Sequence, residues 1–162
     1  MLGDVEAQIG SWVVLFGQDL QESFLDVKRK LFADLDGKAP AHAILATNSS
    51  YIVSSRIADV TRRPGKVLNL HFFNPALVMK LVEVVQGRHV SDETAQISMA
   101  LCERLDKVGV HLRKEVEGFL LNRILRAIAQ EAFWLLEMGW RVSRTLTRPR
   151  SMALDIRWEH FA

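Results

Sequence analysis

The stretch VLNLHFFNP, at residues 67–75, decides the fold class of this chain. It is apolar almost throughout as far as Phe73, and the turn-forming pair Asn74-Pro75 ends it. A short apolar run that ends at a turn signal is typical of a buried strand. Ala43 to Ala46 and Met79 to Val85 show the same pattern. Helical periodicity separates and flanks these runs, and strands that alternate with helices predict an α/β fold with a parallel sheet.

The remaining elements are predicted on both sides of these strands. One strand is expected within residues 11–22. Helical spacing and capping residues predict four helices: one from Ser23 to Gly37, a short one that Ser54 or Ser55 caps, one from Ser91 to Gly109, and a long amphipathic one from Gly118 to Gly139. A further strand is predicted from Val110 to Val116, between the last two helices. No strand follows the last helix, so it is expected to open a helical domain. We therefore divide the chain into 1–117, 118–139 and a divergent tail, 140–162.

Composition and charge limit the class of protein. The 162 residues are 49% hydrophobic and 25% charged, as in a globular domain, and a formal net charge of +2 gives no argument for nucleic-acid binding. No apolar run reaches the roughly 18 residues of a membrane span. The first ten residues have neither a secretory nor a transit pattern, so the cytosol is the default compartment. The single cysteine, Cys102, is interpreted as a core residue, and no His or Cys spacing matches a metal site.

His71 is the candidate general base. Ligands of a parallel α/β sheet bind beyond the carboxyl ends of its strands, and Ser50 and His71 both lie at such ends. Histidine suits acid–base catalysis near neutral pH, although a core histidine bonded to the backbone is the alternative. Glu83 favours catalysis, because a carboxylate among apolar strand residues is costly to bury unless it is paired. An exposed strand edge is the alternative for Glu83.

Three further polar residues have weaker support from their positions. Asn48 and Ser50 follow a predicted strand, where such residues most often form a turn or a helix cap. Asn122 lies near the start of the long helix, where it either contacts solvent or offers its amide to a ligand oxygen.

The stretch from about Val27 to Gly139 resembles the 3-hydroxyacyl-CoA dehydrogenase family. The matching strings, in order and at family spacing, are VKRKLFADLD, ILATNSS, HFFNP, VMKLVEVV, SDET and GFLLNR. The phenylalanines of HFFNP favour the fatty-acyl branch over the related sugar-acid dehydrogenases. The resemblance implies a partial Rossmann-like, NAD-binding domain in residues 1–117, followed by the first helix of an all-α substrate and dimerisation domain at 118–139.

The resemblance also implies catalytic roles. His71 matches the base that takes the proton of the substrate 3-hydroxyl as hydride leaves for NAD, and Glu83 matches the acid that orients His71. Ser50 matches the serine that bonds the substrate oxygen. Asn122 matches an asparagine near the thioester carbonyl.

The resemblance implies NAD as the cofactor, with Asn48, Lys28 and Ser50 at positions that contact it. The chain departs from the family in having no G-x-G-x-x-G turn, and Glu117 stands where the family usually has proline. Relative to the family the chain is expected to be truncated at both ends, with the first strands of the sheet missing. We expect this chain alone to bind NAD weakly or not at all and to be poorly active.

The resemblance therefore implies oxidation of an L-3-hydroxyacyl-CoA to a 3-oxoacyl-CoA in fatty acid metabolism. The partners it implies are an acyl-CoA and, as is typical of the family, a second copy in a homodimer; neither nucleic acid nor a membrane is implied. Two alternatives remain open, a catalytically inactive fragment of the family and a dehydrogenase of another 3-hydroxy acid.

Overall fold

The structure, a computed structural model, describes residues 13–15 and 23–139. The chain divides into two units, Met1–Phe119 and Leu120–Ala162. The first contains the sheet, and the second contains the long helix; each is described by itself. The predicted tail at 140–162 lies outside the described residues.

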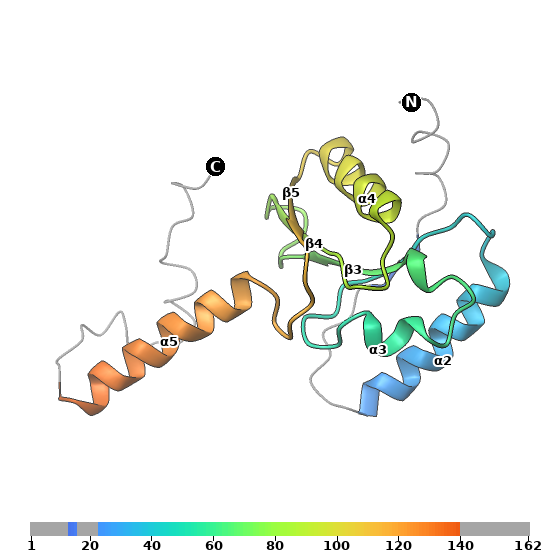
Figure 1. Ribbon diagram of the computed structural model, residues 1–162. Coiled ribbons are helices and arrows are strands. Elements are labelled where there is room, and N and C mark those ends of the chain that lie inside the picture. Colours follow the sequence, from blue (N-terminus) through green and yellow to red (C-terminus); the bar gives the residue numbers. More distant parts are fainter. Residues whose placement is uncertain (1–12, 16–22, 140–162) are drawn as a thin grey trace. The chain divides into compact units, whose positions relative to one another are not determined.

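A five-stranded sheet organises the described part of the first unit (Figure 1). Its strands, in spatial order, are β1 (Val13–Leu15), β2 (Leu45–Thr47), β3 (Val67–Phe72), β4 (Leu81–Val85) and β5 (Val108–Leu112). The pairs β1–β2, β2–β3 and β4–β5 are parallel, whereas β3 and β4 are antiparallel. The predicted α/β fold is confirmed, but the sheet is not parallel throughout. Residues 73–80 are too short for the crossover of a dozen or more residues that a parallel neighbour needs, so the chain turns back at once.

The helices agree with the sequence pattern except at some of their ends. They are α2 (Ser23–Lys38), α3 (Ser55–Ala58), a 3₁₀ turn at Pro64–Lys66, α4 (Asp92–Arg104) and α5 (Leu121–Glu137). As predicted, Ser91 caps α4, its hydroxyl accepting a hydrogen bond from the amide of Thr94. The prediction that Gly109 ends this helix is wrong. The chain leaves α4 at Arg104, turns through Asp106 with a φ of 55°, and Gly109 lies in β5.

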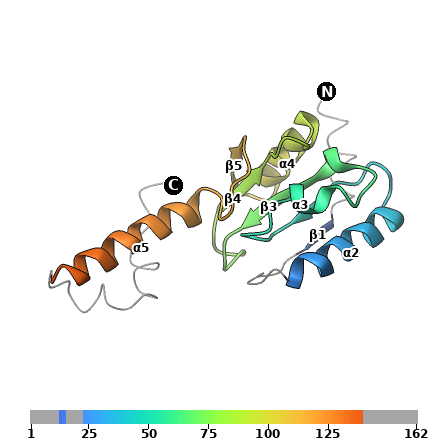
Figure 2. The same ribbon diagram turned by 60° about the horizontal axis from the view of Figure 1, so that its bottom comes forward.

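Alternate residues of the strands face two hydrophobic clusters, because successive side chains of a strand point to opposite faces. One cluster lies toward α2 and α3 and consists of Phe32, Leu45, Ile52, Ile57, Ala58 and Val67. The other lies toward α4 and consists of Ile44, Ala46, Leu68, Leu70, Val82, Val84, Val90, Ile97, Leu101 and Cys102. Figure 2 shows α4 on one face of the sheet and α2 and α3 on the other. Cys102 is fully buried, so its prediction as a core residue is confirmed.

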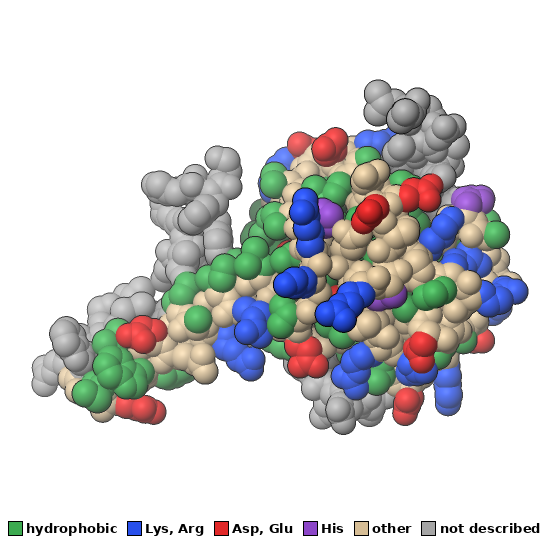
Figure 3. Space-filling model, viewed as in Figure 1, with side chains coloured by type: hydrophobic (Ala, Val, Ile, Leu, Met, Phe, Trp, Pro, Cys, Tyr) green, Lys and Arg blue, Asp and Glu red, His purple; other side chains and the backbone are tan. Residues whose placement is uncertain are grey.

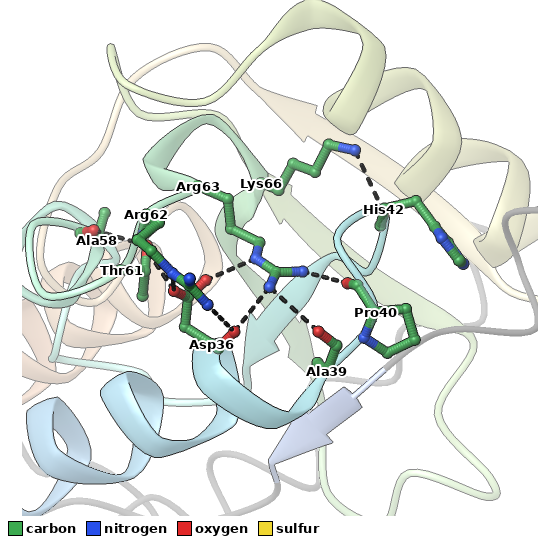
Figure 4. A network of polar contacts seen from close by, with 9 residues as sticks. All are labelled: Asp36, Ala39, Pro40, His42, Ala58, Thr61, Arg62, Arg63 and Lys66. Carbon is green, nitrogen blue, oxygen red and sulfur yellow. Dashed lines mark hydrogen bonds and ion pairs between the residues drawn. The ribbon is translucent and has the colours of Figure 1, made fainter.

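A polar network fixes the carboxyl end of α2 (Figure 4). The buried Asp36 accepts hydrogen bonds from the guanidinium groups of Arg62 and Arg63, at 2.9 and 2.6 Å. Arg63 also donates to the backbone carbonyls of Asp36, Ala39 and Pro40. Carbonyls at a helix end lack partners within the helix, and here Arg62 and Arg63 both donate to the carbonyl of Asp36 in the last turn of α2.

The described part of the second unit is α5. Its helical prediction is confirmed, but the helix begins after Gly118 and Phe119, which both have positive φ. Hydrophobic side chains run along it (Figure 3), and the exposed large ones are Ile124, Ile128, Phe133 and Trp134. In residues 13–15 and 23–139, no helix has the length and apolar character that crossing a membrane requires.

Candidate active site

His71 and Glu83 face each other across the antiparallel strands β3 and β4, as directly paired residues. Nδ1 of His71 lies 2.8 Å from Oε2 of Glu83. The two side chains are 6% and 1% exposed, so the alternative that Glu83 lies at an exposed strand edge is wrong. Glu83 lies instead in a strand with neighbours on both sides. A buried carboxylate is costly unless it is paired, and the imidazole of His71 is a partner of Glu83 here.

Ser50 reaches the other nitrogen of the same imidazole. It follows β2, and its Oγ lies 2.9 Å from Nε2 of His71 near the end of the adjacent strand β3. Because these two strands are parallel, their carboxyl ends lie at the same edge of the sheet, and Ser50 and His71 therefore lie close together. The rings of Phe73 and Phe119 approach the imidazole edge-on, with centroids at 4.8 and 5.3 Å. These rings and the burial of His71 restrict the access of water.

The partners of His71 assign the direction of each hydrogen bond. A carboxylate only accepts, so the proton on the imidazole belongs on Nδ1, where it is donated to Glu83. Nε2 then has a lone pair, and the Ser50 hydroxyl donates to it. This tautomer, inferred from the partners, leaves Nε2 able to accept a proton from a ligand. The carboxylate of Glu83 then provides a negative charge next to Nδ1, on the opposite side of the imidazole ring.

Asn48 and Lys28 lie at the same strand edge as Ser50. Oδ1 of Asn48 accepts a hydrogen bond from the amide of Phe72 at 2.6 Å, which ties the end of β2 to the end of β3. Lys28, on α2, is only 8% exposed, and its ammonium donates to Oγ1 of Thr47 at 3.1 Å. The two predicted cofactor residues therefore come from a helix and a loop that meet at the end of β2.

Asn122 is the second residue of α5 and is half-buried. It belongs to the second unit, so its predicted role near a substrate carbonyl stays a prediction. Sequence reasoning did not identify two supports of the loop that carries Ser50. One is Asn69, whose polar side chain inside the apolar stretch 67–73 was the available signal. The other is Gly118, whose amide donates to the carbonyl of Ser50 at 2.9 Å.

No group of three or more His, Cys, Asp or Glu side chains in the described residues could hold a metal ion.

Comparison with known proteins shows the family. Residues 21–116 match the family described as 3-hydroxyacyl-CoA dehydrogenase, NAD binding domain. The chain belongs to the 3-hydroxyacyl-CoA dehydrogenase family. It is 43% identical over 112 residues to the probable 3-hydroxybutyryl-CoA dehydrogenase of Bacillus subtilis, covering 69% of this chain and 39% of that protein. It is 41% identical over 115 residues to the 3-hydroxybutyryl-CoA dehydrogenase of Clostridioides difficile, covering 71% and 41%.

Solved structures support the same assignment. The (S)-3-hydroxybutyryl-CoA dehydrogenase of Ralstonia eutropha superimposes with a TM-score of 0.77 at 29% identity, covering 94% of this chain and 52% of that one. The 3-hydroxybutyryl-CoA dehydrogenase of Escherichia coli K12 gives a TM-score of 0.72 at 35% identity, covering 83% and 27%. The chain spans about two fifths of the length of the curated relatives described above.

The family's domain is NAD-binding, which indicates NAD as the cofactor. The polar groups at the strand edge fit part of that molecule. The ammonium of Lys28 and the amide of Asn48 are donors suited to ribose hydroxyls and to a carboxamide oxygen, and the hydroxyl oxygen of Ser50 can accept from a cofactor N–H or O–H. The family's cofactor chemistry is therefore compatible with the residues that this edge presents.

Proposed function

We propose that the protein containing this chain oxidises an L-3-hydroxyacyl-CoA to a 3-oxoacyl-CoA, with His71 as the general base, in fatty acid metabolism. The observation that carries the proposal is the hydrogen-bonded series Ser50–His71–Glu83 at the carboxyl edge of β2 and β3. Membership of the family supports the reaction class.

Oxidation of a secondary alcohol removes a hydride from carbon and a proton from oxygen. NAD supplies the hydride acceptor when it is bound, with Lys28, Asn48 and Ser50 as the residues that would contact it. The proton needs a base, and the lone pair on Nε2 of His71, which accepts from the Ser50 hydroxyl without a ligand, can take it. Ser50, already 2.9 Å from Nε2, is placed to hold the substrate oxygen next to that nitrogen.

Glu83 makes the proton transfer favourable. When Nε2 accepts the proton, the imidazole becomes a cation in a buried place, which is costly without an opposite charge. The carboxylate of Glu83 provides that charge at 2.8 Å and keeps the ring in the orientation that directs Nε2 toward Ser50. Asn122, by the family resemblance, polarises the thioester carbonyl.

The proposal is tested in the reverse direction, by NADH oxidation with acetoacetyl-CoA. We expect turnover by the protein that contains this chain and a loss of roughly 10²- to 10⁴-fold in kcat for its His71→Gln variant, the range for removal of a general base. His111→Gln is the matched control, because His111 is exposed and its Nε2 bonds Gln86 instead. Absence of NADH oxidation, or equal rates for the His71 and His111 variants, would refute the proposal. Free acetoacetate in place of the thioester tests whether the CoA portion is required.

A further inference from the structure

A second polar residue is buried in the same strand as His71. Asn69 lies in the middle of β3, is 0% exposed and makes three side-chain hydrogen bonds. Its Nδ2 donates to the carbonyls of Ser49 and Ile52, at 3.1 and 3.0 Å. Its Oδ1 accepts from the amide of Ser54 at 2.7 Å. The opposite orientation of the amide would place oxygen against two carbonyl oxygens, so the partners define this one.

The three partners of Asn69 surround Ser50 in the chain. Ser49 comes directly before it, and Ile52 and Ser54 follow in the segment that leads into α3. Backbone on both sides of Ser50 is therefore fixed to the sheet, and the amide of Gly118 holds the carbonyl of Ser50 itself. Loops after strands otherwise have little to define their position. With these bonds the Oγ of Ser50 reaches Nε2 of His71 at 2.9 Å.

Asn69 and His71 are two residues apart on one strand and so share a face of the sheet. We propose that Asn69 is a positioning residue, which acts through Ser50 by holding the loop at residues 49–54 so that the serine hydroxyl stays within hydrogen-bond distance of His71. The catalytic consequence rests on the proposed function, whereas the hydrogen bond itself does not. A residue that merely stabilised the fold would leave the environment of the imidazole unchanged.

The test compares Asn69→Leu, Ser50→Ala and the double variant in a mutant cycle. Leucine has nearly the shape of asparagine and removes all three hydrogen bonds. The readout is the ¹⁵N resonance of His71 Nε2, assigned by its loss in His71→Gln. We expect Asn69→Leu to move this resonance most of the way toward its position in Ser50→Ala, and to move it no further in the Ser50→Ala background. Non-additivity of this kind is the signature of two residues acting through one contact.

Two further variants keep the test decisive. Asn69→Asp retains the acceptor for Ser54 and removes both amide donors, so it serves if the leucine variant does not fold. Ile97→Val is the matched control, because Ile97 is a core residue of α4, on the other face of the sheet, and its truncation lowers stability without touching the loop. An Nε2 resonance in the folded Asn69 variants that stays at the wild-type position would overturn the proposal. So would one that moves equally in Ile97→Val.

The kinetic arm uses the same variants with acetoacetyl-CoA and NADH. We expect kcat to fall about tenfold in Asn69→Leu, as for the loss of one hydrogen bond, with KM for the thioester nearly unchanged and no further fall in the Ser50→Ala background. Falls that multiply in the double variant would contradict the proposal. If the wild-type protein that contains this chain shows no turnover, the proposed function fails, while the resonance of His71 still decides the role of Asn69.

Discussion

Replacing Glu83 by glutamine removes the negative charge next to Nδ1 of His71, while the shape of the side chain at position 83 changes little. The carboxylate lies 2.8 Å from Nδ1, inside the sheet. For charge centres about 4 Å apart, at an effective dielectric constant of about 20, the attraction between carboxylate and imidazolium is about 4 kcal/mol. Since about 1.4 kcal/mol corresponds to one factor of ten in rate, we expect Glu83→Gln to lower kcat about a thousandfold.

The rotation of the glutamine amide decides whether the loss is still larger. If its oxygen faces Nδ1, the tautomer is kept and only the charge is lost. If its nitrogen donates to Nδ1, the proton moves to Nε2, and the base has no lone pair for the substrate. In both cases the imidazolium form is destabilised.

The assay is NADH oxidation with acetoacetyl-CoA under saturating conditions, with thermal unfolding measured in parallel. Glu93→Gln is the control, because Glu93 is exposed in the first turn of α4. Glu83→Asp keeps the charge on a shorter side chain and is expected to lose less activity than Glu83→Gln. A folded Glu83→Gln variant with a kcat within about tenfold of wild type, well short of the range for acid–base catalysis, would refute this account of the charge.

Two other predictions concern stability and reactivity. Hydrogen bonds from Arg62 and then Arg63 lower the pKa of Asp36 from 3.8 to about 2. The unfolded chain therefore binds the proton first, and roughly 2 kcal/mol of stability, present above about pH 5, is lost as the pH falls toward 2. Urea unfolding should show a shallower acid dependence for Asp36→Asn, and equal slopes would contradict the assignment. Burial raises the pKa of Cys102 to about 11. Iodoacetamide should label this thiol in native buffer only as fast as the chain opens, and labelling at the rate of a free thiol would show that Cys102 is accessible.

The sequence predicts the strands and most helices because their apolar periodicity is strong. It does not predict the direction of β4, since an apolar run such as Met79–Val85 is the same in either direction. What distinguishes the two directions is the length of the connection at residues 73–80. The sequence also predicts the wrong end for α4. Glycine is a common helix terminator, which favours Gly109 as the end, but the chain already turns at Asp106, and Gly109 lies in β5 beside Met99 and Cys102.

The candidate site was predictable to a different extent for each residue. Glu83 could be paired with His71 because a buried carboxylate needs a partner, and the same argument applied to Asn69 would have indicated its loop contacts. Gly118 gave no comparable signal, because its contribution is a backbone amide, which every residue except proline has. The placement of Asn122 relative to the sheet depends on the packing of a second unit, which periodicity along one helix does not encode.

The antiparallel pairing of β3 and β4 makes the His71–Glu83 hydrogen bond a contact between residues that are near each other in the sequence. His71 and Glu83 are 12 residues apart and are joined through a short turn, whereas Ser50 and His71 are 21 residues apart with α3 between them. The entropy lost on closing a loop grows with the logarithm of its length, so the two closures cost nearly the same in chain entropy. They differ in what must fold around them. The His71–Glu83 hydrogen bond needs only the pairing of β3 with β4. The Ser50–His71 hydrogen bond needs α3, the loop at residues 49–54 and Asn69 to be in place together.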